Sequence, residues 1–66
     1  MLSGWISFVD VNEPCGTITL DSGKSFYFNP MAEENDPVFY TGQYVLFDVT
    51  EDTFGQVATN IRDSIS

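Results

Sequence analysis

Hydrophobic and polar residues alternate with a period of two along most of the chain, which is the pattern of β-strands with one buried face. The clearest case is the pair of segments 17–20 and 25–29, which flank Gly23. Glycine adopts positive φ without strain, so this spacing predicts a tight turn and a β-hairpin. We expect Ile18, Leu20, Phe26 and Phe28 to face inward, and Thr17, Thr19, Tyr27 and Asn29 to face outward.

Three further segments, 5–9, 44–50 and 57–61, alternate in the same way. In the first, strict alternation separates two pairs, Ile6 with Phe8 and Trp5 with Ser7. Val9 then follows Phe8 directly, and two successive hydrophobic residues in such a strand indicate a β-bulge nearby. The last segment is marked by Val57, Thr59 and Ile61. The positions expected in the core are Ile6, Val9, Val45, Phe47, Val49 and Ile61.

The residues between these segments predict where the strands end and where the connecting loop and turn lie. Pro30 ends the third strand because proline cannot donate a hydrogen bond to a ladder. Residues 31–41 then form an acidic loop, and residues 51–55 form a turn. Within the loop, Phe39 and Tyr40 either extend an aromatic surface or form a separate apolar patch, or, as we favour, one of them plugs the barrel end. Five short strands at this spacing predict an all-β, closed or partly open barrel with no helix longer than one turn.

The composition is that of one small folded domain. The chain has 66 residues, of which 42% are hydrophobic and 15% aromatic. That content is too high for a disordered acidic segment, and the aromatic side chains bury enough area to build a compact core. We expect residues 1–63 to form one monomeric domain. Residues 64–66 are expected to be a soft polar tail that either ends the chain or begins a linker.

The charge balance limits the possible partners. Ten acidic residues against Lys24 and Arg62 give a formal net charge of −8. Nucleic-acid phosphates are bound mainly by Lys and Arg side chains, so this composition argues against tight binding of a polyanion. An acidic surface also suits a basic protein partner, because charge complementarity raises association rates and selectivity.

The cysteine content and the first residues of the chain give an expectation for the cellular location of the protein. Cys15 is the single cysteine, so no internal disulfide forms, which fits a reducing cytoplasm. The first residues show no signal peptide, and no hydrophobic run approaches the ~18 residues that span a membrane. We therefore expect a cytoplasmic protein without membrane association.

Catalytic and metal-binding patterns are not found in the sequence. Histidine is absent, so Cys15 has no base to activate it, and we expect no enzymatic activity. Two acidic clusters could offer oxygen ligands to a hard cation, but their spacing does not match a calcium loop. They are Glu33, Glu34 and Asp36, and Asp48, Glu51 and Asp52. We expect both to be solvated, with no metal and no cofactor.

Several segments, in their order and spacing, resemble the cold-shock domain family. Residues 42–49, Gly-Gln-Tyr-Val-Leu-Phe-Asp-Val, resemble the family's Gly-Gln-x-Val-x-Phe-x-Val/Ile strand, and residues 55–61 resemble its closing Gly-Pro-Gln-Ala-x-Asn-Val. Residues 1–4 resemble the family's start, while residues 16–18 and 26–29 stand where its two ribonucleoprotein motifs lie. The resemblance covers nearly the whole chain. It implies an OB-fold, a small five-stranded antiparallel Greek-key β-barrel.

The resemblance also implies a nucleic-acid site, which this chain keeps only in part. Family members stack bases on outward aromatic residues and hold the backbone with nearby lysines. Phe8 and Tyr27 keep aromatic positions, Asn29 is a candidate hydrogen-bonding residue, and Lys24 is a candidate phosphate contact. The family's other groups are replaced by Glu13, Pro14, Cys15, Thr17 and Pro30.

The resemblance and the charge favour different functions. The fold type favours a non-enzymatic module with a degenerate, weak site for single-stranded RNA or DNA. The charge favours an acidic protein-interaction module, an adaptor or a competitor of nucleic acid, that has lost nucleic-acid binding. We adopt the first as the working hypothesis and keep the second as the alternative.

Overall fold

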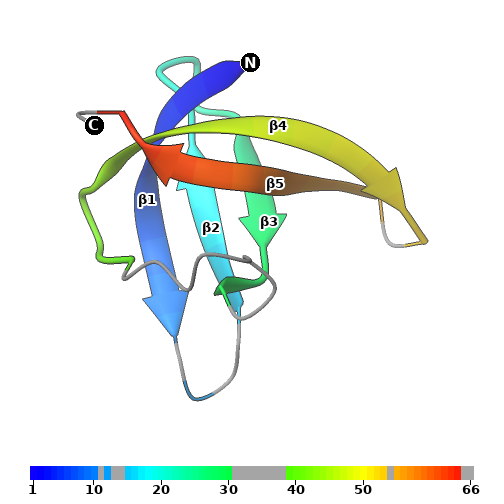
Figure 1. Cartoon of the computed structure of the whole chain (residues 1–66), viewed down its shortest axis with the longest axis horizontal. Coiled ribbons are helices and arrows are strands. Elements are labelled where there is room, and N and C mark those ends of the chain that lie inside the picture. Colours follow the sequence, from blue (N-terminus) through cyan, green and yellow to red (C-terminus); the bar gives the residue numbers. More distant parts are fainter. Residues whose placement is uncertain (11, 13–14, 31–38, 54, 65–66) are drawn as a thin grey trace.

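In a computed structural model, the chain forms five β-strands that close into a barrel, as predicted (Figure 1). The structure describes residues 1–10, 12, 15–30, 39–53 and 55–64. The strands are β1 (Leu2–Asp10), β2 (Cys15–Thr19), β3 (Ser25–Phe28), β4 (Tyr44–Asp52) and β5 (Gly55–Asp63). These residues include no α-helix, and hence no helix that is long and apolar enough to cross a membrane.

The strand order around the barrel is β1–β2–β3–β5–β4, and β4 closes the ring by pairing with β1. Four junctions are antiparallel, but β3 and β5 run parallel, with Tyr27 opposite Val57. The expectation of a wholly antiparallel barrel is therefore wrong at this junction. The reason is geometric: an odd number of strands in a closed ring cannot alternate in direction all the way round. The fold is otherwise the predicted small OB-like barrel.

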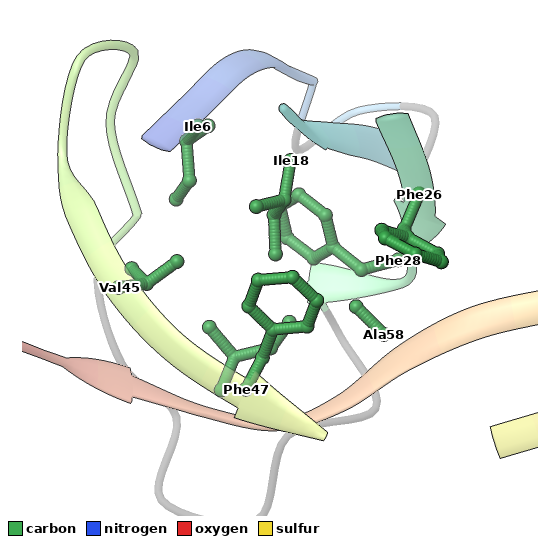
Figure 2. Close-up of a cluster of buried hydrophobic side chains, with 8 residues drawn as sticks. Ile6, Ile18, Phe26, Phe28, Val45, Phe47 and Ala58 are labelled. Carbon is green, nitrogen blue, oxygen red and sulfur yellow. The ribbon is translucent and has the colours of Figure 1, made fainter. Parts of the chain in front are cut away.

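The hydrophobic core fills the barrel, and Figure 2 shows most of it. Phe47 is fully buried, and its ring meets that of Phe26 edge-on with 5.8 Å between centroids. Every residue predicted to face inward is either buried or packed against this core. The buried hydrophobic residues are Ile6, Ile18, Phe26, Phe28, Val45, Phe47, Ala58 and Ile61. The inward faces of β2, β3 and β4 were thus predicted correctly.

A β-bulge in β1 confirms the irregularity predicted near Val9. Ile6 lies opposite Ile18 of β2, but the next registered pair is Phe8 with Thr17, so β1 holds one extra residue, Ser7. Because of this extra residue, Ile6 points inward while Phe8 points outward. Strict alternation, which places Ile6 and Phe8 on one face, fails at this point.

A second bulge, in β5, was not predicted. Between Leu46 and Asp48 of β4 the register with β5 shifts, and Asn60 adopts a positive φ of 53°. Asparagine tolerates this left-handed conformation better than most residues. As a result Ala58 and Ile61, three residues apart, are both buried. The even alternation expected through residues 57–61 is therefore wrong, and it missed Ala58 as a core residue.

The turn at Gly23 and the barrel end agree with the sequence predictions. The turn expected over residues 51–55 is shorter, because β4 continues to Asp52 and β5 begins at Gly55. Gly23 has a φ of 93°, and its N–H donates to the Leu20 carbonyl at 2.9 Å, which closes the turn between β2 and β3. Phe39 packs edge-on against the buried Phe28 ring with 5.4 Å between centroids, whereas Tyr40 is exposed. One of the two loop aromatics therefore plugs the barrel, as favoured. Residues 31–38 of the predicted acidic loop lie outside the described residues.

Candidate functional site

The outer surface of β1, β2 and β3 brings together the two aromatic residues predicted to bind. Residues directly opposite each other on paired strands point to the same face of a sheet. Phe8 lies opposite Thr17, and Thr17 lies opposite Tyr27, so the two rings share one row with Thr17 between them. At about 4.8 Å per strand, the backbones that carry the rings are about 10 Å apart.

Both rings of this row are open to solvent. Phe8 is 50% exposed and Tyr27 is 70% exposed. An aromatic side chain left in water forgoes the stabilisation that burial provides, and exposed hydrophobic groups gathered on one face mark interaction sites. The two residues therefore form a platform suited to flat ligands, with the smaller Thr17 as a gap at its centre.

A chain of hydroxyl groups forms the polar part of the same face. Ser7 Oγ lies 2.7 Å from Thr17 Oγ1 and accepts a hydrogen bond from Thr19 Oγ1 at 2.9 Å. Thr19 Oγ1 lies 3.0 Å from Ser25 Oγ on β3. Ser7 reaches both threonines because the β1 bulge leaves it on the outer face beside Phe8. These exposed hydroxyls keep further donor and acceptor capacity toward solvent.

The remaining two predicted site residues lie differently. Asn29 directly follows β3 and is exposed, two residues beyond Tyr27. The Lys24 ammonium lies 5.2 Å from the centroid of the Phe26 ring, a cation–π contact with a core residue. Asn29 is therefore near Tyr27 along the chain. The Lys24 ammonium, in contrast, is placed over the Phe26 ring and not beside Phe8 and Tyr27. Sequence spacing alone gave no signal for this orientation.

Charge is distributed unevenly over the described strands. Asp10, at the end of β1, is the one charged residue within β1, β2 and β3. The hairpin of β4 and β5 carries the acidic residues Asp48, Glu51, Asp52 and Asp63. Arg62 lies on β5, where its Nη1 donates to the Asn60 carbonyl at 2.7 Å. The platform face is thus almost neutral, on a strongly acidic chain.

A second aromatic pair, which the sequence analysis did not single out, borders this face. Trp5 of β1 lies opposite Tyr44 of β4, and their ring centroids are 6.4 Å apart. Alternation alone could have placed Trp5 outward, opposite in phase to the buried Ile6. It could not have paired Trp5 with Tyr44, because that pairing joins distant parts of the chain.

The described residues offer little to a metal ion or a nucleophilic reaction. No group of three His, Cys, Asp or Glu side chains is arranged among them to hold a metal. The cluster of Glu33, Glu34 and Asp36 lies outside these residues, as does Glu13. Cys15 is an exposed free thiol. The arrangement suits binding by stacking and hydrogen bonding.

Comparison with known proteins gives no family assignment. No protein-family model matches the chain, and no curated protein matches its sequence at a significant level.

Proposed function

We propose that this domain is a non-enzymatic binding module of cold-shock type that weakly binds single-stranded RNA or DNA on the outer face of β1–β3. The observation that carries the proposal is the row Phe8–Thr17–Tyr27, with two exposed rings on one face of an OB-like barrel. OB-type barrels bind oligonucleotides on their sheet face, and bases stack on such rings with little sequence preference.

A comparison of the free energies of base stacking and of charge repulsion favours weak binding over no binding. A base stacked on an aromatic ring contributes about 1–3 kcal/mol. A phosphate about 10 Å from a carboxylate is repelled by only about 0.4 kcal/mol in water, and by less in physiological salt. Stacking on two rings therefore outweighs individual repulsions from acids on the β4–β5 hairpin. The association entropy and the absence of basic residues on β1–β3 keep the net affinity low.

The first prediction concerns the two rings. Phe8→Ala and Tyr27→Ala should each weaken binding of a labelled single-stranded oligonucleotide by about 1–3 kcal/mol, because each removes one stacking surface. Conversely, Thr17→Phe should strengthen binding, because it places a third ring in the gap of the row. Fluorescence anisotropy at low and moderate salt measures all three.

Two features make this test discriminating. Lys24 Nζ faces the Phe26 ring and Arg62 lies on β5, so neither basic group serves the platform. Affinity should therefore change little with salt, whereas phosphate-driven binding falls steeply with it. If the wild-type protein ignores single strands, or if the folded Thr17→Phe and Phe8→Ala variants bind equally well, the proposal is wrong.

A second candidate function, binding of a basic protein segment, is favoured by the edge of β4. β1 pairs with β4 only from Tyr44 to Phe47, while β4 continues to Asp52 paired with β5. Within the described strands, Val49, Thr50 and Glu51 of β4 are paired only with β5, and Asp48 and Glu51 lie on this part of the strand. The chain's own α-amino group lies 3.9 Å from Asp48 Oδ1 at this edge. Such an edge can accept an added extended strand.

The second prediction tests this alternative with a lysine-rich extended peptide as the probe. Glu51→Lys should slow its association, most visibly at low salt, because it reverses charge on the edge. Asp21→Lys, in the turn between β2 and β3, makes the same charge change away from the edge and serves as the matched control. Equal effects of the two variants would show a general response to net charge and would count against an edge site.

A further inference from the structure

We infer that Trp5 and Tyr44 form a second base-stacking surface, so that a bound single strand runs from β3 across β1 onto β4. The inference rests on the proposed function and extends its site to a strand that the predicted residues do not reach.

The β1 bulge makes the two aromatic pairs part of one face. In a regular strand, residues three apart point to opposite faces. Trp5 and Phe8 are three apart, yet Trp5 lies opposite Thr19 and Phe8 lies opposite Thr17, and these two threonines share the outer face of β2. Trp5 and Phe8 therefore both point outward, opposite two residues of β2 that are about 7 Å apart along that strand.

The rows that carry these pairs are adjacent and physically joined. One row runs from Tyr44 through Trp5 and Thr19 to Ser25, across β4, β1, β2 and β3. The neighbouring row contains Phe8, Thr17 and Tyr27. Ser7 links the two rows, because its hydroxyl contacts both Thr17 and Thr19. A strand lying on Phe8 and Tyr27 thus meets the second pair without crossing a gap in the sheet.

The surroundings of the second pair suit a nucleobase. Tyr44 is 55% exposed, and its ring is tilted by 54° from that of Trp5, so it keeps an open face. Among the described residues, the neighbours paired directly with this pair are uncharged: Thr19 lies opposite Trp5, and Ser64 donates from N–H and Oγ to the Tyr44 carbonyl. Arg62, opposite Leu46, lies in the next row of the same face. A base can therefore stack here without desolvating a charged group, and the hydroxyls offer hydrogen bonds to its edge.

The test, which is the third prediction, uses Trp5 as its own reporter, since it is the single tryptophan of the chain. Titration with an oligothymidine of about eight nucleotides, within the site size of one OB fold, should quench Trp5 emission. An abasic oligonucleotide of equal length should not. Tyr44→Ala should weaken binding about fivefold or more, the loss of one stacked base, while Tyr44→Phe should keep it.

The outcomes separate this inference from the proposed function. If labelled oligothymidine binds in a Phe8-dependent manner but Tyr44→Ala has no effect and Trp5 emission is unchanged, the second surface is wrong and the proposed function stands. If wild-type protein does not bind at all by anisotropy, both fall. Quenching by the abasic strand would also overturn the inference, because it would show contact without stacking. Tyr44 is exposed, so its variants should fold, which circular dichroism checks.

Discussion

Replacing Phe47 with alanine is expected to unfold most of the domain. Phe47 has no solvent exposure, and it packs edge-on against Phe26 at the centre of the barrel. Removing a buried phenyl ring costs about 3–5 kcal/mol, through lost burial and the cavity left behind. At about 0.05–0.15 kcal/mol per residue, a chain of this length has only about 3–10 kcal/mol of stability in total. The substitution is therefore expected to remove much or all of the domain's stability.

Urea titration followed by far-ultraviolet circular dichroism measures this effect. The matched control is Phe8→Ala, which removes the same side chain from an exposed position and should change stability far less. A Phe47→Ala protein that unfolds at the wild-type urea concentration would show that the inward phase assigned to β4 is wrong. A register slip of one residue reverses that phase completely.

Gly16→Ala is expected to destabilise the barrel strongly although it adds only one methyl group. A Cβ built at this position lies 2.5 Å from Cε1 of Phe28 and 2.8 Å from the carbonyl oxygen of Phe8. Neither neighbour can move easily: the Phe28 ring is packed against Phe39, and the Phe8 carbonyl belongs to the β1 backbone. Overpacking of this kind costs about 1–3 kcal/mol, more than the few tenths to ~1 kcal/mol that alanine gains through the unfolded chain.

Thermal unfolding of Gly16→Ala should therefore show a midpoint several degrees below that of the wild-type protein. Cys15→Ala provides the comparison, because Cys15 is the exposed neighbour of Gly16 on the opposite face of β2. Surface substitutions of this type usually change stability by less than about 0.5 kcal/mol. If both variants melt together with the wild type, the close approach of β1 and β3 around Gly16 is not as tight as the structure has it.

Most of the barrel could be predicted from local patterns, because each strand buries one face. The phases of Phe26, Val45 and Phe47 and the turn at Gly23 depend only on neighbours in sequence. The bulge at Asn60 could not be predicted in this way. Its cause is the pairing of β5 with β4, and its effect, the burial of Ala58, contradicts simple alternation. The parallel junction of β3 and β5 likewise follows from closure of the ring and not from any single segment.

The candidate site was predictable to the same extent. Alternation places Tyr27 outward, whereas the outward position of Phe8 was expected only from the family resemblance, because strict alternation groups it with the buried Ile6. Pairing through Thr17 places the two rings on one row. The direction of Lys24 toward Phe26 depends on a rotamer choice at the barrel end that composition does not encode. The proximity of Trp5 to Tyr44 depends on contact between β1 and β4, which are separated by more than thirty residues in the sequence. Long-range pairing, more than local pattern, is what the sequence left open.

The parallel junction leaves β3 extensively paired on one side and weakly paired on the other. Tyr27 is paired on one flank with Thr17 through a regular hairpin, but on the other flank the register between β3 and β5 is the single pair with Val57. By contrast, β4 and β5 are paired at seven positions between Val45 and Asp52, with one bulge between Leu46 and Asp48. We expect the barrel to open locally first at the β3–β5 seam, so amide protons there should exchange fastest. Because Tyr27 lies on this seam and Phe8 does not, opening of the seam changes the spacing between the two rings.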